Sequence, residues 1–298
     1  MYDICIIGGG PAGMTAALYS ARAGRSTVIL EEKTFGGQMG ETSMIENMPG
    51  SPNTEGWELA MKFSQQVMEL PVEAVYEKAE KIESLTDHVK VTTSGGQEIE
   101  ARRLILAIGV KRRRLGVPGE DLLTGKGISF CAVCDGAFFR GKDVAVVGGG
   151  NTALEDALYL SGICSRVYLV VRKDYFRGQE ALQQRVREKE NIEVCFETRI
   201  TAVHGAGKVS SVTMESATGS REVELAGVFV AIGLSPDTSL YGQVVDTTPE
   251  GYISTDERMQ TSDPLIYAAG DIRSKEIRQI VTALGDGAIA AEMAGRSL

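Results

Sequence analysis

The segment Phe130–Gly136 combines the residue types that thiol–disulfide chemistry requires. Cys131 and Cys134 are separated by two residues, and Asp135 follows the second cysteine directly. Cysteines at this spacing can close a disulfide across one turn. If the second cysteine opens a helix, the exposed N–H groups there stabilise its thiolate. A neighbouring carboxyl group can move the protons that disulfide exchange needs, so the segment predicts a redox-active pair with Asp135 as its acid–base group.

Two other interpretations of the pair are a zinc half-site and two incidental core thiols. Zinc needs about four ligands. The remaining cysteines (Cys5, Cys164 and Cys195) stand alone in apolar segments, and the only imidazoles are His88 and His204. A Cys-x-x-Cys pair near a strand–helix–strand pattern is typical of redox centres. We therefore favour a redox pair and expect no metal, with both alternatives open at this point.

Length and charge narrow the class of protein. A chain of 298 residues predicts about two domains, each with its own core. The net charge of −9 argues against a nucleic-acid partner. The N-terminus has no basic stretch and its apolar run stops at Gly8, so we expect neither a signal peptide nor a membrane span. Five cysteines without framework spacing suit a cytoplasmic protein.

A glycine turn near the N-terminus has the pattern of a dinucleotide-binding motif. Its elements are a strand at Ile4–Ile7, the turn Gly8-x-Gly10-x-x-Gly13, a helix at Ala12–Ala23 and a strand at Thr27–Leu30. The first glycine permits the turn, the second admits a pyrophosphate, and the third lets helix pack on strand. Glu31 ends the second strand, where a carboxylate can hydrogen-bond a ribose diol. A glycine-rich turn without a ligand is the alternative.

The same pattern returns about 140 residues later. Its elements are a strand at Val144–Val147, the turn Gly148-x-Gly150-x-x-Ala153, a helix at Leu154–Leu160 and a strand at Val167–Val171. The repeat predicts two dinucleotide sites in one chain. The second strand here is followed by Arg172, Lys173 and then Arg177 in place of an acid. Cations at this position attract a 2′-phosphate and predict NADP, unless they form only a solvated basic turn.

Further segments complete the organisation of the chain. Two glycine-rich loops cover Phe35–Gln38 and Ile45–Gly50, a helix is expected at Glu55–Glu69, and strands alternate over residues 72–106. Turn signals at Gly116–Glu120 and Gly233–Asp237 indicate boundaries, and the tail predicts a strand at Leu265–Asp271 and a helix at Ala283–Ala294.

These motifs together resemble the low-molecular-weight, bacterial-type thioredoxin reductases over almost the whole chain. The Cys-Ala-x-Cys-Asp-Gly block, combined with the Ala-Gly-Asp and Arg-Gln motifs of the tail, is highly specific. The resemblance implies an α/β fold of two Rossmann-like, three-layer domains, the second inserted into the first. An FAD domain would comprise 1–115 and 240–298, and an NAD(P)H domain carrying the cysteine pair would comprise 116–239.

The resemblance also implies roles for individual residues. Cys134 would be the sulfur that faces the flavin, Cys131 the sulfur that attacks the substrate, and Asp135 the proton donor. FAD would contact Gly8, Gly10, Pro11, Ala12, Gly13, Glu31, Gly37, Gln38, Asn47, Gly109, Gly270, Asp271, Arg278, Gln279 and Ile280. NADPH would contact Gly148, Gly150, Asn151, Thr152, Ala153, Arg172, Lys173 and Arg177.

The expected activity is reduction of thioredoxin or a thioredoxin-like protein by NADPH, through FAD and the cysteine pair, in a cytoplasmic homodimer. Larger disulfide reductases use a C-terminal His as acid–base, but no His follows His204, which leaves Asp135. The chain departs from the family at Val171, where His is usual, and at Ile108, where Thr is usual. Some relatives draw electrons from ferredoxin or another donor, which is the alternative expectation.

Overall fold

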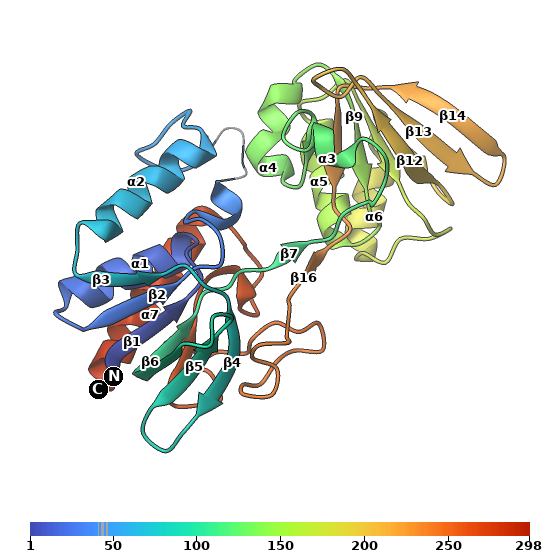
Figure 1. Ribbon diagram of the computed structural model, residues 1–298. Helices are drawn as coiled ribbons and strands as arrows, with labels where there is room; N and C mark the ends of the chain where they lie inside the picture. Colours follow the sequence, from blue (N-terminus) through green and yellow to red (C-terminus); the bar gives the residue numbers. More distant parts are fainter. Residues whose placement is uncertain (41, 43–44, 46) are drawn as a thin grey trace. The chain divides into compact units, whose positions relative to one another are not determined.

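The chain folds into two compact units, each described here by itself. The computed structural model describes residues 1–40, 42, 45 and 47–298. Unit 1 joins both ends of the chain (Met1–Thr42, Met48–Lys111 and Ser235–Leu298), and unit 2 consists mainly of Arg112–Leu234. In Figure 1 unit 1 carries the blue, teal and red ends of the colour scale, and unit 2 carries the green to orange middle.

Unit 1 is built on a sheet whose centre is parallel. The parallel strands are β1 (Tyr2–Ile7), β2 (Thr27–Leu30), β3 (Val72–Val75), β6 (Glu98–Leu106) and β17 (Ile266–Ala268). Strands β4 (Ala79–Ser84) and β5 (Val89–Thr93) extend the long β6 in antiparallel fashion. β1 lies between β2 and β6, so the turn after β1 opens at the carboxyl edge of the sheet, where parallel α/β sheets bind ligands.

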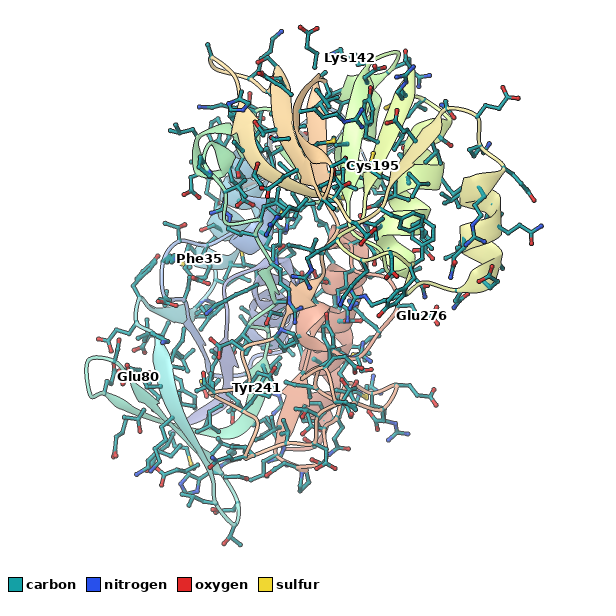
Figure 2. The ribbon with its side chains drawn as sticks, turned by 90° about the vertical axis from the view of Figure 1, so that its right-hand side faces the viewer. Phe35, Glu80, Lys142, Cys195, Tyr241 and Glu276 are labelled. Atoms are coloured by element: carbon teal, nitrogen blue, oxygen red, sulfur yellow. A yellow bond between two sulfur atoms is a disulfide. The ribbon has the colours of Figure 1, made fainter. Side chains whose placement is uncertain are left out.

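Small residues let the helices of unit 1 pack closely. The helices are α1 (Pro11–Arg22), α2 (Gly56–Met68) and α7 (Ile280–Arg296), with short 3₁₀ turns η1 (Gly37–Met39) and η3 (Gly270–Ile272). α1 and α7 pack against each other, and a Cβ at Gly287 would lie 2.2 Å from Ala12 O. Tyr241 is fully buried in the same unit and donates a hydrogen bond to Gly251 O at 2.8 Å (Figure 2).

Unit 2 has three layers around a parallel sheet of order β11-β10-β9-β15-β8. Its strands are β8 (Ile128–Ser129), β9 (Asp143–Val147), β10 (Arg166–Val170), β11 (Ile192–Cys195) and β15 (Gly227–Val230). Successive side chains of β9 point to opposite faces of this sheet. Val144 and Val146 pack on the core that includes helix α5 (Asn151–Ser161), and Ala145 and Val147 pack on the core of the antiparallel sheet.

The outer layers of unit 2 come from three further helices and an antiparallel sheet. The helices are α3 (Glu120–Leu123), α4 (Ala132–Asp135) and α6 (Glu180–Arg187), and a 3₁₀ turn, η2 (Gly136–Phe139), follows α4. The antiparallel strands are β12 (Arg199–His204), β13 (Ser211–Ser216) and β14 (Gly219–Glu224). Cys131 thus lies between β8 and α4, and Cys134 lies within α4.

The chain enters the main segment of unit 2 and returns to unit 1 at short strands that pair with each other. These strands are β7 (Lys111–Arg112) and β16 (Leu234–Ser235). Lys111 Nζ also forms an ion pair with Asp237 Oδ2 at 2.9 Å. The sequence placed the crossings at 115/116 and 239/240, whereas the units change after Lys111 and after Leu234.

Candidate redox centre and nucleotide sites

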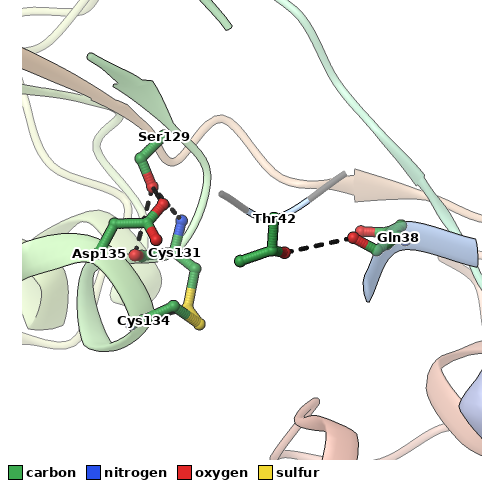
Figure 3. Close-up of a disulfide and its surroundings, with 6 residues drawn as sticks. All are labelled: Gln38, Thr42, Ser129, Cys131, Cys134 and Asp135. Carbon is green, nitrogen blue, oxygen red and sulfur yellow. Dashed lines mark hydrogen bonds between the residues drawn. A yellow bond between two sulfur atoms is a disulfide. The ribbon is translucent and has the colours of Figure 1, made fainter. Parts of the chain in front are cut away.

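Cys131 and Cys134 form a disulfide, with their Cα atoms 5.3 Å apart (Figure 3). Cys131 is the N-cap of α4, and its Sγ accepts a hydrogen bond from Cys134 N at 3.2 Å. The helix therefore begins after the first cysteine and not at the second. Cys131 has the extended backbone (φ −146°) that an N-cap requires. The N–H group of the helix start accordingly stabilises negative charge on Cys131 when the disulfide is reduced.

Asp135 ends α4 and is held by a serine that the motifs did not identify. Ser129 Oγ lies 2.6 Å from Asp135 Oδ2 and accepts a hydrogen bond from Cys131 N at 3.1 Å. Figure 3 shows Ser129 between the carboxyl group and the backbone of Cys131. A serine at this position commonly forms hydrogen bonds to nearby backbone groups. Its place two residues before Cys131 was therefore the sequence signal that could have indicated this contact.

The other cysteines lack the features of a reactive thiol. Burial raises the pKa of Cys5 to about 12 and that of Cys164 to about 11. Burial also raises the pKa of Cys195, which is half-buried on β11 (Figure 2). Across the described part of the chain, no three His, Cys, Asp or Glu side chains gather as a metal site. Because Cys131 and Cys134 are bonded to each other, the structure supports the redox interpretation of the pair.

The first glycine turn leaves room for a ligand at one position and none at the others. Gly8 has φ +107°, and a Cβ there would lie 2.4 Å from Ala107 O. A Cβ at Gly13 would lie 1.8 Å from Gly8 O, so the helix rests directly on the turn. A Cβ at Gly10 would meet nothing within 4 Å. Gly10 is also the N-cap of α1, and Pro11 opens that helix without an N–H group.

Three features adjoin the first turn. Glu31 follows β2, and its Oε2 accepts a hydrogen bond from Gly9 N at 2.7 Å. Gly36 N donates to Gly9 O at 2.8 Å, and a Cβ at Gly37 would lie 3.2 Å from Gly10 Cα. Gln38, also in η1, donates from Nε2 to Val110 O at 2.6 Å. The predicted FAD residues of the N-terminal segment thus gather at the carboxyl edge of the sheet.

The tail of the chain returns to the same edge. Gly270 has φ +80°, and a Cβ there would lie 2.8 Å from Ala12 Cβ. Arg278 Nε donates to Asp271 O at 3.1 Å, and the Arg278 guanidinium lies 4.1 Å from the centroid of Tyr252. Gln279 is the N-cap of α7, and Ile280 is its first residue. The start of α7 therefore lies beyond the Gly270 turn, which itself contacts the first turn of α1.

A buried ion cluster beneath this turn was not predicted. Asp286, on α7, forms ion pairs at 2.9 Å with both Arg273 and Lys275, and accepts a hydrogen bond from Gly270 N at 3.0 Å. The three charged side chains are only 11–12% exposed. An acid flanked by two glycines in a helix of mostly small residues was the signal that could have revealed the cluster, which holds the Gly270 turn in place.

The second glycine turn repeats the geometry of the first. Gly148 has φ +151°, and a Cβ there would lie 2.4 Å from Ala231 O. A Cβ at Gly150, the N-cap of α5, would again meet nothing within 4 Å. Asn151 and Thr152 open α5 and are exposed, whereas Ala153 is fully buried.

The strand end beside the second turn is basic. Arg172, Lys173 and Arg177 are exposed, and within the described residues none of them forms an ion pair. The backbone N–H of Arg177 donates to Gly149 O at 2.6 Å, which keeps this segment against the turn. Val171 is buried, and its Cγ1 would lie 2.9 Å from a Cβ at Gly149.

The two remaining predicted FAD residues lie in loops. Asn47 is exposed in the loop before α2, and Gly109 follows β6 with φ +60°. Glu46, which belongs to the Ile45–Gly50 motif, lies outside the described residues.

Comparisons with known proteins agree with this arrangement. The family model for pyridine nucleotide-disulphide oxidoreductases matches residues 2–287. The chain belongs to this family. It is 43% identical over 295 residues to a thioredoxin reductase from Bacillus subtilis, covering 98% of this chain and 93% of that protein. The resemblance inferred from the motifs is therefore confirmed.

Solved structures of relatives support the fold class. The thioredoxin reductase of Streptococcus pyogenes is 44% identical and superposes with a TM-score of 0.95, covering 99% of this chain and 97% of that one. The thioredoxin reductase of Lactococcus lactis is 41% identical but superposes with a TM-score of 0.69, covering 99% and 98%. The predicted α/β fold with two dinucleotide-binding domains is confirmed. Among the described residues, no helix has the length and apolar composition needed to cross a membrane.

Proposed function

We propose that the chain is a disulfide reductase that passes two electrons from NADPH, through FAD and the Cys131–Cys134 disulfide, to thioredoxin or a thioredoxin-like protein. The observation that carries the proposal is the disulfide at the start of α4, beside Asp135. The same chain has two glycine turns, each with open space for a ligand at its second glycine. The relatives called thioredoxin reductases favour this activity over the alternative of a ferredoxin-dependent enzyme.

FAD fits the first glycine turn and the tail of unit 1. The open position at Gly10 and the N-terminus of α1 suit its pyrophosphate, and the Glu31 carboxylate suits a ribose diol. Asp271, Arg278, Gln279 and Ile280 would surround its ribityl chain and ring. When bound, the flavin supplies the step from a hydride to a two-electron reduction of a disulfide.

NADPH fits the second turn in unit 2. The open position at Gly150 can admit a pyrophosphate, with Asn151, Thr152 and Ala153 at the helix start. The guanidinium groups of Arg172 and Arg177 can each make charge-assisted contacts with a 2′-phosphate, and Lys173 adds a point charge. The unpaired basic surface beside Gly149 supports NADPH over NADH, even though Val171 replaces the usual His.

The exchange step follows from the geometry of α4. In the reduced protein the Cys131 thiolate attacks a sulfur of the partner's disulfide, forms a mixed disulfide and releases one partner thiolate, which takes up a proton. The Cys134 thiolate then attacks Cys131 Sγ, restores the internal disulfide and releases the second partner thiolate, which is also protonated. The hydrogen bond from Cys134 N lowers the cost of charge on Cys131 and supports its role as the attacking sulfur.

The reaction requires that the two units change their relative orientation. The cysteine pair must meet the flavin to be reduced and a protein disulfide in solvent to be oxidised, and the nicotinamide needs the same face of the flavin. Strands β7 and β16 and the glycines that flank them, Gly116, Gly119 and Gly233, all with positive φ, can absorb such a rotation. A crosslink between the units that left both flavin reduction and thioredoxin turnover intact would contradict it.

The remaining parts of the proposal concern assembly and location. A cytoplasmic homodimer without a nucleic-acid partner is consistent with the net charge of −9 and the unpaired cysteines. Sedimentation of the flavin-loaded protein tests the dimer.

An anaerobic titration of the flavin-loaded protein with NADPH, NADH and reduced ferredoxin tests the function. We expect rapid bleaching of flavin absorbance by NADPH, slower bleaching by NADH and none by ferredoxin. The Cys134→Ser variant is expected to bleach but not to reduce thioredoxin. Bleaching by ferredoxin alone, or wild-type turnover of Cys134→Ser, contradicts the proposal.

A further inference from the structure

Reduction of a disulfide leaves one proton that the protein itself must supply. Conversion of a disulfide to two thiols takes two electrons and two protons, whereas a hydride brings two electrons and one proton. The second proton comes from solvent and needs an acid near the sulfurs. Asp135 is the acid next to Cys134, so the position of its carboxyl group limits the proton step.

Ser129 connects this acid to the backbone of Cys131. The residue is only 5% exposed, and its hydroxyl contacts Asp135 Oδ2 at 2.6 Å, Cys131 O at 3.3 Å and Cys131 N at 3.1 Å. Cys131 N can only donate, so it occupies a lone pair of the hydroxyl oxygen. The single hydroxyl proton then goes to the closer acceptor, the carboxylate of Asp135.

The same three contacts can serve both protonation states of the acid. When Asp135 is ionised, the hydroxyl donates to its Oδ2. When Asp135 is protonated, the carboxyl group can donate to the hydroxyl oxygen while the hydroxyl proton turns to Cys131 O. No heavy atom has to move between the two states, and a methyl group in place of the hydroxyl loses this property.

A pocket borders the acid. It has a volume of about 470 Å³, it lies within unit 2, and its lining includes Ser129, Asp135, Lys126, Lys142 and Lys208. The three lysines are exposed, and Figure 2 shows Lys142 at the outer surface of unit 2. Water in this pocket can therefore return a proton to Asp135 after each exchange.

We propose that Ser129 is the positioning residue that holds Asp135 for proton transfer to the cysteine pair. The inference rests on the proposed disulfide reduction. The Ser129 hydroxyl bonds Asp135 and the backbone of Cys131, so it acts through Asp135 by fixing the carboxyl group in both protonation states, beside a pocket of unit 2.

The test is a double-mutant cycle in the flavin-loaded, full-length protein with NADPH and oxidised thioredoxin. Ser129→Ala is expected to lower kcat about 10-fold with an unchanged KM for thioredoxin, because a hydrogen bond to a charged group is lost. Ser129→Thr retains the hydroxyl and should stay within about 2-fold of wild type. In an Asp135→Asn background, Ser129→Ala should change kcat by less than about 2-fold.

The pH profile separates positioning from a loss of local structure. Without the donor to its carboxylate, the pH dependence of kcat should move upward by about one unit. Other ionisable groups must be accounted for: Lys126, Lys142 and Lys208 line the pocket, and α5, which packs on α4, carries Asp156, whose pKa burial raises to about 7. The profile is therefore repeated in an Asp156→Asn background, where the shift should persist.

A second measurement keeps the inference separate from the proposed function. Reduction of the Cys131–Cys134 disulfide by dithiothreitol, followed by alkylation and mass spectrometry, needs neither NADPH nor thioredoxin. Ser129→Ala should slow it, and Ser129→Thr should not. Failure of wild-type turnover with NADPH or thioredoxin overturns the proposed function alone. A fully additive cycle, or wild-type rates for Ser129→Ala in both measurements, overturns the role of Ser129.

Discussion

The two glycine turns share one backbone plan and differ in the chemistry beside it. In each, the first glycine donates its N–H to the end of the next strand, from Gly8 to Leu30 O at 2.8 Å and from Gly148 to Val170 O at 3.0 Å. Beyond that strand the first turn has Glu31, whose carboxylate accepts from Gly9 N, and the second has Val171, which can only pack on Gly149. The shared backbone geometry leaves space for a pyrophosphate, and the residues that follow the strand determine which nucleotide can bind.

The turns also differ in tightness. The first uses Gly13 where the second has Ala153, so α1 sits closer to its strand than a side chain would permit. Further along the helices, the fully buried Ala16 of α1 corresponds to Asp156 of α5. A tightly packed turn suits a cofactor that stays bound. A nucleotide that enters and leaves in each cycle can be bound by a turn with looser packing.

The largest effect is expected from exchanging the third residue of the turns. Gly13→Ala places a Cβ against a backbone carbonyl, which forces the backbone to move and should cost about 3 kcal/mol or more in unfolding free energy, with loss of bound FAD. The matched Ala153→Gly change should cost only about 1 kcal/mol. Chemical denaturation and flavin content measure both. Equal losses of unfolding free energy for the two variants would contradict the idea that the first turn is packed more tightly than the second.

The second glycines test whether both turns hold a nucleotide. A Cβ at Gly10 or Gly150 meets no protein atom, so Ala at either position should leave the stability of the flavin-free protein nearly unchanged. It should fill the pyrophosphate position and weaken binding about 100-fold, of FAD for Gly10→Ala and of NADPH for Gly150→Ala. Titrations followed by fluorescence measure the two affinities. Undiminished NADPH binding by Gly150→Ala would make the second turn a feature of the fold alone.

The basic residues after the second turn should set the choice of nicotinamide. Arg172→Ala and Arg177→Ala should each reduce the preference for NADPH over NADH about 10-fold or more, because each removes a charge-assisted contact with the 2′-phosphate. Arg185→Ala, an exposed change on α6, is the control for charge alone. The ratio of kcat/KM for the two nucleotides is the measurement, and a ratio unaffected by either change would mean a solvated turn.

The smallest effect is expected for Asp156, which occupies the position in α5 that corresponds to Ala16 in α1. Burial raises the pKa of Asp156 from 3.8 to about 7, so the folded protein binds its proton more tightly than the unfolded chain. Stability is therefore lost as pH rises from about 4 to 7. Asp156→Asn should stabilise the protein on the order of 1 kcal/mol at pH 8 and not at pH 4. Glu190→Gln, an exposed change elsewhere in unit 2, is the control, and thermal unfolding at both pH values is the readout.

The sequence predicted those parts of the molecule that depend on local pattern. The strand at Thr27–Leu30 was predicted with the bounds of β2, and the helix expected at Glu55–Glu69 is α2, Gly56–Met68. Periodicity and glycine spacing suffice for such elements because they are properties of a short window. The disulfide was one of three interpretations, and the structure distinguishes them.

Contacts between distant residues could not be predicted in this way. Asp286 meets Arg273 and Lys275 only because α7 packs over the Gly270 turn. The place of Cys131 as the N-cap depends on the extended backbone after β8, which no spacing rule specifies. The predicted crossing points lie a few residues C-terminal to the boundaries of the compact units, because the turn signals at Gly116 and Gly233 flank the paired strands that join the units.

The pairing of β7 with β16 has a consequence for how the chain folds during synthesis. Unit 1 cannot complete its sheet until β17 has been made, because that strand pairs with β6 from the other side of the insertion. The entropy of closing a loop depends on the distance its ends must bridge and grows slowly with its length. Once the inserted segment has folded and its ends have paired, it acts on unit 1 as a short connection. When the C-terminal segment leaves the ribosome, β17 can therefore pair at once with β6 in a sheet that has already formed.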